Sequence, residues 1–246
     1  MLSHTGNKRT FKHNVMLSAL LSLTAGFVNI IGFSTFMVFT TNITGHVAQL
    51  SEKVAMGDYN GARMFGLWLV AFLLGAFSSS LAVTLIGRTK RTAYTYPFLV
   101  EILILAFVMV ATPKNNNLSV VDVEFLAGCL LFAMGLQNAM VSIISGSVVR
   151  TTHLTGMFTD LGIELSTLIT HKEHRKEVLK YKVNLRLVII FFFIFGCISG
   201  GFLYKSFKMA TFWFPIIVLV IVIFYDGLRV NSIRFFTRVK HIGDAK

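Results

Sequence analysis

Two short polar stretches of the chain carry residue types that could bind a small solute inside a membrane. They read TTNITGHVAQL over residues 40–50 and TTHLTGMFTDL over residues 151–161. Threonine side chains can cap a helix, and glycine lets a backbone approach a ligand closely. We therefore predict that both stretches interrupt a helix and line one site. Aligned without gaps, they agree at Thr40/Thr151, Thr41/Thr152, Thr44/Thr155, Gly45/Gly156 and Leu50/Leu161.

The candidate solute-binding residues come from these stretches and from amide side chains upstream of them. A helix following each stretch would be capped by a threonine, Thr41 or Thr44 in the first and Thr152 or Thr155 in the second. The alternative that no ligand binds stays open, because threonine also caps helices, glycine also packs them and amides also bond between them. The predicted substrate-binding set is Asn29, Thr41, Asn42, Thr44, Gly45, Gln137, Asn138, Thr152, His153, Thr155 and Gly156.

Three acidic residues are candidates for coupling an ion, because carboxylates inside a bilayer are costly and usually functional. Asp160 and Glu164 are four residues apart and share a helix face, and Glu101 falls in another apolar run. Asp160 is the main candidate. For Glu164 the alternative stays open that it is an acid at a helix start or one exposed to solvent. For Glu101 the alternative stays open that it lies at the membrane interface. No metal-ligand spacing, nucleophile pattern or phosphate loop is present. The sequence therefore predicts no metal, no cofactor and no enzymatic activity.

The similarity between the two halves extends beyond the polar stretches. Three further blocks recur in the same order, and the second copy takes up its extra length in the basic segment 171–183. Four collinear blocks indicate an internal repeat. The additional pairs are residues 26–29 with 135–138, 73–81 with 194–202, and 96–98 with 214–216.

Composition places the chain in a membrane. Hydrophobic residues make up 54% and charged residues 14%, whereas soluble domains carry roughly 25% charged residues. A spanning helix needs roughly 20 mainly apolar residues. We predict an all-α polytopic membrane protein with about six transmembrane helices, arranged as two three-helix inverted repeats with discontinuous helices. The predicted spans are residues 15–39, 64–86, 94–111, 123–145, 185–204 and 211–225.

The domain organisation follows from these spans. Residues 15–55 would extend roughly 60 Å as one helix, twice the roughly 30 Å bilayer core, so we expect a break at residues 40–45. An eight-span count, with a crossing after each break, would make the halves parallel; we favour six because residues 46–53 and 160–164 are polar. The expected units are a cytoplasmic basic tail (1–14), the first repeat (15–112), the second repeat (113–228) and another basic tail (229–246).

The net charge of +12 is explained by topology. With six spans and a cytoplasmic N-terminus, most of the 23 Lys and Arg residues fall on the inner side, as the positive-inside rule requires. We expect an inner-membrane protein with both termini in the cytoplasm and no nucleic-acid partner. Its expected partners are the lipid bilayer and an unknown small molecule or ion, and a homodimer stays open. Cys129 and Cys197 lie in apolar spans and predict buried side chains rather than a disulfide.

The blocks AGFVNIIGF…TTNITGHVAQL and GLQNAM…VRTTHLTGMFTDLG resemble the YoaK-like family of bacterial integral membrane proteins of unknown function. The resemblance runs from the first span to the last, and its second block is the more specific. In that family an Asp usually stands at the position of Asn29, and an Asn at that of His46. The resemblance implies a multi-span inner-membrane protein for which transport has been supposed, without an established substrate.

The leading functional prediction is a small-solute secondary transporter or permease of the inner membrane. The alternative, from another class, is a non-transporting scaffold or sensor that acts through the basic cytoplasmic segments. A third possibility, an intramembrane enzyme, has no sequence pattern in its favour.

Overall fold

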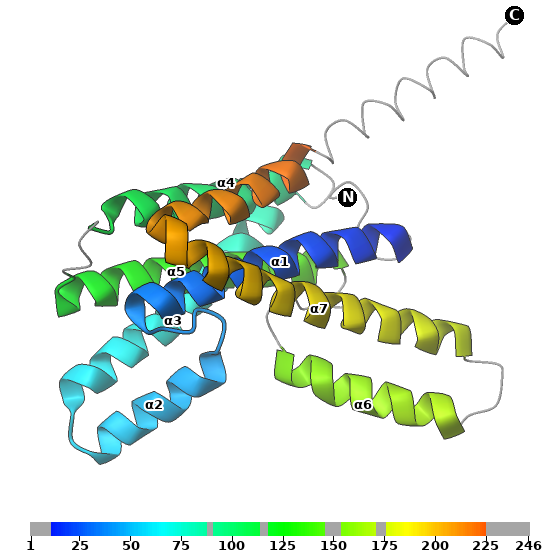
Figure 1. The fold of residues 1–246 in the computed structure, drawn as a ribbon, viewed down its shortest axis with the longest axis horizontal. Coiled ribbons are helices and arrows are strands. Elements are labelled where there is room, and N and C mark those ends of the chain that lie inside the picture. The colour runs from blue at the N-terminus through cyan, green and yellow to red at the C-terminus, as the bar shows by residue number, and fades with distance from the viewer. Residues whose placement is uncertain (1–10, 88–90, 114–117, 146–153, 171–175, 225–246) are drawn as a thin grey trace, which may run out of the picture.

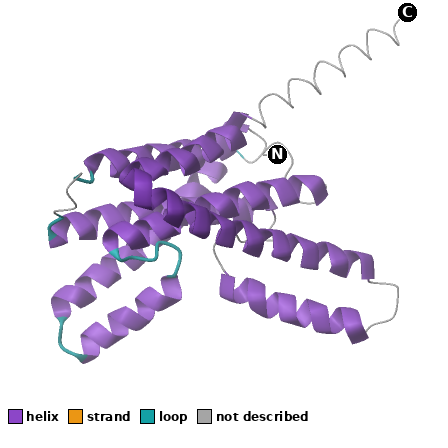
Figure 2. Ribbon diagram, viewed as in Figure 1, coloured by secondary structure: helices purple, strands orange, loops and turns teal. Residues whose placement is uncertain are grey.

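A computed structural model describes residues 11–87, 91–113, 118–145, 154–170 and 176–224. Every regular element in these ranges is a helix (Figure 2), which confirms the all-α class. The helices are α1 (Phe11–Phe36), α2 (Ile43–Ala55), α3 (Tyr59–Ile86), α4 (Arg91–Ala111), α5 (Val120–Ser145), α6 (Leu154–Thr170), α7 (Lys176–Phe207), the 3₁₀ helix η3 (Lys208–Phe212) and a last helix of residues 213–224.

Five stretches of the described chain are long and apolar enough to cross a membrane. The last contains 48 residues and would measure about 72 Å as one straight helix, more than twice the bilayer core of about 30 Å. It is divided at η3, where the chain turns back on itself (Figure 1). The stretch as a whole is therefore long enough for two crossings, which agrees with about six spans. The five stretches are Val15–Phe36, Tyr59–Ile86, Thr92–Ala111, Val120–Ile143 and Glu177–Phe224.

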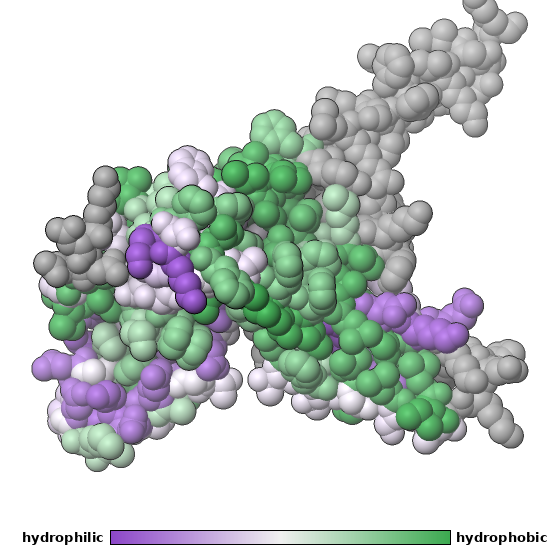
Figure 3. Space-filling view, viewed as in Figure 1, coloured by the Kyte–Doolittle hydropathy of each residue, from purple (hydrophilic) through white to green (hydrophobic). Residues whose placement is uncertain are grey.

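The helices α2 and α6 are shorter than α1, α3, α4, α5 and α7. They contain 13 and 17 residues, about 20 and 25 Å, and neither is among the stretches able to span. This favours the six-span count over eight. In the space-filling view hydrophobic side chains cover α7 and the last helix, while hydrophilic atoms gather over α2 and the turn into α3 (Figure 3). The helix after the first break, α2, thus differs in polarity from the spans around it.

Two helix pairs form the centre of the bundle, α1 with α7 and α3 with α5. Each pair crosses at glycines. A Cβ atom built on Gly26 would lie against Gly196 and the Phe193 carbonyl, and one built on Gly75 would lie against the Phe132 carbonyl. Small residues at such crossings let the backbones approach closely, which favours helix association within a bilayer.

The glycines at the two crossings correspond to one another in the sequence alignment. Gly26 aligns with Gly135, which packs against the Phe72 carbonyl, and Gly75 aligns with Gly196. The crossing of α1 with α7 and the crossing of α5 with α3 are therefore made by aligned glycines. Both central pairs join one helix from each half.

The chain breaks between α1 and α2, as the sequence predicts. Met37 adopts φ 58° directly after α1, and the break folds back on α1 because Gly32 has no side chain. A Cβ there would lie 2.7 Å from Cγ2 of Thr40. The predicted threonine cap is wrong, since α2 begins at Ile43. The preceding residue, Asn42, accepts a hydrogen bond from the Gly45 N–H at 3.1 Å.

The turn between α2 and α3 is short, because α2 ends at Ala55 and α3 begins at Tyr59. Asp58 caps α3 by accepting a hydrogen bond from the Gly61 N–H at 3.0 Å and pairs with Lys53 at 3.0 Å. The Gly61 N–H, and then the Lys53 ammonium, hold the pKa of Asp58 below its usual value. This cap lets the helix start at Tyr59, five residues before the apolar run.

Candidate solute-binding site

A cavity of about 490 Å³ lies where the α1–α2 break meets the start of α6. Its volume falls in the range of roughly 300–1,000 Å³ that small-molecule sites occupy. Amides, hydroxyls and three phenylalanines surround it, and none of its described lining residues is charged. The lining residues are Asn29, Phe39, Thr41, Asn42, Ile43, Thr44, Phe72, Asn138, Leu154, Thr155 and Phe193.

Residues predicted from both polar stretches meet at this cavity. From the first half these are Asn29, Thr41, Asn42 and Thr44, and from the second half Asn138 and Thr155. The two stretches are more than 100 residues apart in the chain. Their convergence forms one mixed polar and aromatic surface, although occupancy by a solute stays a prediction.

Among the other predicted binding residues, Gly45, Gln137 and Gly156 do not line the cavity. A Cβ on Gly45 would lie 2.5 Å from Nδ2 of Asn42, so this glycine makes room for the cap of α2. Gln137 is fully buried and donates a hydrogen bond at 2.9 Å to the Leu21 carbonyl, which ties α5 to α1. Gly156 is the third residue of α6. Thr152 and His153 lie outside the described residues.

Asn29 fixes the first break to α1. Its Oδ1 accepts hydrogen bonds from both the backbone N–H and the hydroxyl of Thr41, at 3.2 and 3.0 Å. Phe33 stacks on Phe39 across the break, with 4.3 Å between ring centroids, and Nε2 of His46 lies 2.8 Å from the Phe39 carbonyl oxygen. The break is therefore an ordered wall of the cavity.

The lining contains residues that the repeat alignment matches between the halves. Asn29 aligns with Asn138, and Thr44 with Thr155. Extending the block at residues 73–81 one position upstream also matches Phe72 with Phe193. The sequence analysis missed these two aromatic residues, although their position three residues before Gly75 and Gly196 could have indicated them.

The helices α2 and α6 begin at the cavity and diverge from it toward opposite sides of the molecule (Figure 1). Ile43 and Thr44 are the first two residues of α2, and Leu154 and Thr155 are the first two of α6. The first N–H groups of a helix have no partner within it, and they carry a partial positive charge. The surface is hollowed between α2 and the arm formed by α6 and α7 (Figure 3).

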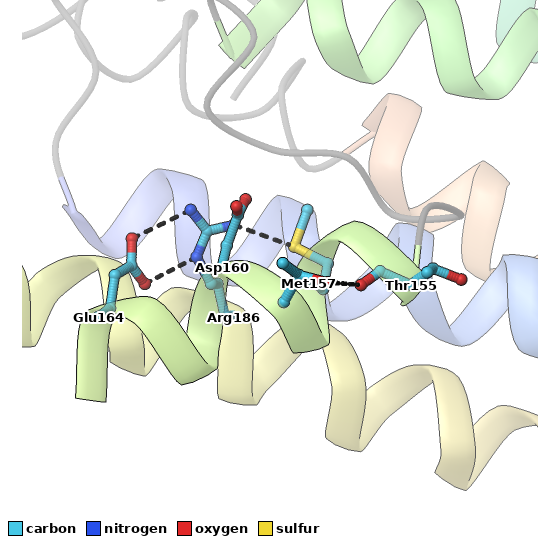
Figure 4. A network of polar contacts seen from close by, with 6 residues as sticks. Thr155, Met157, Asp160, Glu164 and Arg186 are labelled. Carbon is cyan, nitrogen blue, oxygen red and sulfur yellow. Dashed lines mark hydrogen bonds and ion pairs between the residues drawn. The ribbon is translucent and has the colours of Figure 1, made fainter. Parts of the chain in front are cut away.

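A second polar cluster lies on α6 and α7. Arg186 donates to the Glu164 carboxylate through Nε at 2.7 Å and Nη2 at 3.0 Å, and its Nη1 lies 2.8 Å from Oδ2 of Asp160 (Figure 4). Neither acid lines the cavity. An ion that binds Asp160 would therefore compete with the guanidinium. The sequence analysis assigned Arg186 only to topology, and the four-residue spacing of the acids was the signal for one shared partner.

Glu101 lies apart from both groups. Its side chain has no exposed surface, and neither carboxyl oxygen has a hydrogen-bond partner in the part of the chain that the structure describes. The interfacial position that the sequence left open is thus not the one observed. The basic tail of residues 229–246, on which the scaffold or sensor role depends, lies outside the described residues.

Replacing Asn29 tests its support of the break. Asn29→Leu removes the acceptor of two hydrogen bonds, each worth about 1 kcal/mol, and should lower the unfolding free energy by about 1–3 kcal/mol. Asn29→Asp keeps an acceptor for both Thr41 donors and should cost less. Denaturant titration in detergent micelles measures both. Equal losses for the two variants would contradict a hydrogen-bonding role.

The all-helical fold and its five long apolar stretches define a multi-pass helical membrane protein. Residues 17–225 match the family described as "Protein of unknown function (DUF1275)", and the chain belongs to that family. It is 26% identical over 223 residues to the UPF0700 transmembrane protein YoaK of Bacillus subtilis (strain 168), covering 89% of this chain and 96% of that protein. No solved structure matches. The resemblance to YoaK-like proteins is confirmed.

Proposed function

We propose that the protein is a small-solute secondary transporter of the bacterial inner membrane and that the cavity holds the solute. The observation that carries the proposal is the lining of that cavity by aligned residues of both halves, such as Asn29 with Asn138 and Thr44 with Thr155. Secondary transporters bind solutes between two repeats, at helices interrupted near the bilayer midplane.

We further propose that the halves are inverted repeats. Three spans in each half would reverse the orientation of the second, and the divergence of α2 and α6 toward opposite sides of the molecule in Figure 1 supports this. The exchanged glycine crossings, Gly26 on Gly196 and Gly75 on Gly135, support it too. Alternating access would then be a movement of α2 and α6 with their partner helices about the shared cavity.

The orientation proposed for the chain places both termini in the cytoplasm. Its support is the distribution of lysine and arginine expected for six spans. In that arrangement α2 extends from the cavity toward the outside and α6 toward the cytoplasm. The two half-helices would then flank opposite entrances to one site.

A thermal-shift screen against metabolites and ions tests the proposal. A solute that binds the folded chain raises its apparent stability, and we expect at least one small polar solute to do so. Asn138→Leu should abolish that shift while leaving the unliganded melting temperature nearly unchanged, because Oδ1 of Asn138 has no partner among the described residues. Replacing an unpaired buried acceptor by an apolar group is close to neutral.

Gly162→Ala is a matched control for the screen. Gly162 lies on α6, and a Cβ there would meet nothing within 4 Å. The control should keep the full shift, and proteoliposomes should take up the same solute with wild-type protein and with Gly162→Ala. A shift that survives Asn138→Leu, or a bound solute that is never transported, would contradict the proposed role of the cavity.

A further inference from the structure

Glu101 is the most deeply placed acid among the described residues. It is the eleventh of the 21 residues of α4, about 15 Å from either end of that helix. Its exposed surface is 0%, and both carboxyl oxygens lack a hydrogen-bond partner within the described structure. Buried polar groups are nearly always paired, so an unpaired acid at this depth requires an explanation.

The surroundings of Glu101 are apolar. Phe107 of α4 contacts Phe125 of α5 with ring centroids 6.2 Å apart, and α4 runs antiparallel to α5 (Figure 1). Glu101 precedes Phe107 by six residues, so it is level with Leu131, six residues after Phe125. Leu131 and its neighbour Leu130 are fully buried. No charged side chain of α5 is described at that level.

The charged residues of α3 and α5 all lie near helix starts and have partners. Arg63 and Glu124 pair with each other at 3.0 Å, and Asp122 accepts hydrogen bonds from Ser119. The helix of residues 213–224 contains no charged residue. The charged and titratable residues of α4 and the elements packed on it are Arg91, Tyr94 and Tyr96 of α4, Tyr59 and Arg63 of α3, Asp122, Glu124 and Cys129 of α5, and Lys208 of η3.

The repeat alignment shows what packing alone requires at this position. Pro97 aligns with Pro215, and Glu101 therefore aligns with Leu219 in the last helix. Leu219 is also 0% exposed. An apolar side chain thus satisfies the corresponding position of the other half. A carboxyl group in its place weakens the core, and an isolated carboxylate would weaken it far more than the neutral acid.

We propose that Glu101 is a proton-binding site closed off within the bundle, and that the ion coupled to transport is a proton carried there. The second half of this statement rests on the proposed transport function. When α4 separates from its neighbours, the proton passes from the Glu101 hydroxyl to a water molecule, which breaks the carboxyl O–H bond and leaves a carboxylate and hydronium. Reprotonation from the other side reforms that bond. Asp160 is the poorer carrier because Arg186 occupies it.

Infrared spectroscopy of the full chain in liposomes tests the proton site directly. At neutral pH we expect a carbonyl stretching band of a protonated carboxylic acid that shifts in heavy water. The band should be lost in Glu101→Gln and kept in Asp160→Asn. Glu101→Leu, which copies Leu219 of the other half, gives a second variant that folds without the carboxyl group. A wild-type spectrum without the band, or a band that both Glu101 variants keep, would overturn the proposal that Glu101 binds a proton.

Once the thermal-shift screen has identified a solute, the coupling of proton movement to solute transport can be measured separately. In proteoliposomes a pH gradient should drive accumulation by wild type but not by Glu101→Gln, while solute exchange at equal pH and the thermal shift persist. Accumulation that survives in Glu101→Gln would overturn the coupling role. If no solute shifts the wild type, the proposed transport function fails, whereas the infrared result still decides the proton site.

Discussion

Gly75→Ala is expected to lower the unfolding free energy by about 3 kcal/mol. The added Cβ would meet the Phe132 carbonyl and lie 3.1 Å from the Leu136 nitrogen, and these are backbone atoms that cannot rotate away. Overpacking a tight contact costs about 1–3 kcal/mol, occasionally more. Because the same crossing positions α3 against α5, the variant should also displace Phe72 from the cavity. Denaturant titration in mixed micelles measures the loss.

Gly66→Ala is the matched control, since Gly66 lies on the same helix and a Cβ there would meet nothing within 4 Å. Alanine is the better helix former by about 1 kcal/mol, so this variant should be neutral or slightly stabilising. Gly135→Ala, on the opposite side of the crossing, should behave like Gly75→Ala. Similar effects at Gly66 and Gly75 would mean that the crossing is not a close backbone contact.

Arg186→Met is the second change with a large expected effect. It would leave the Glu164 carboxylate, whose side chain is only 9% exposed, without its guanidinium partner. Breaking a buried ion pair by removing one partner costs about 3–5 kcal/mol, and we expect a loss in that range. The contact between α6 and α7 should loosen first, which hydrogen exchange of the α6 amides would report.

Arg63→Met provides the comparison at a more exposed pair. The Arg63 side chain is 63% exposed while pairing with Glu124 at 3.0 Å, and exposed ion pairs contribute about 0–1 kcal/mol. Adding Glu164→Gln to Arg186→Met should recover part of the lost stability, because the unpaired charge is then removed. No recovery in the double variant would show that Arg186 acts through packing alone.

The candidate site could be predicted in part because its polar stretch occurs twice in the sequence. The repeated polar stretches indicated a break and a shared binding surface, and residues such as Asn29 and Thr155 do line one cavity. Details that depend on neighbours could not be predicted. Asn42 rather than a threonine caps α2 because the helix starts one residue later than Thr41 would require. Phe72 lines the cavity because of the crossing of α3 with α5, which no local pattern reveals.

The acidic residues also show which features the sequence predicts and which depend on the tertiary structure. Sequence periodicity placed Asp160 and Glu164 on one face, but their partner, Arg186, comes from the next helix. The burial of Glu101 could not be predicted, because the position of a residue along a helix does not say which neighbour covers it. The structure covers it completely.

The sequence by itself determined that this is a membrane protein, that it has about six apolar spans, and where the first break lies. These follow from hydrophobic length and from backbone groups that must be satisfied within lipid, which are local properties. Only the tertiary structure decided that α1 pairs with α7 and α3 with α5. Those pairings depend on glycine surfaces that let distant backbones meet, and they bring the first break and the start of α6 to the same cavity.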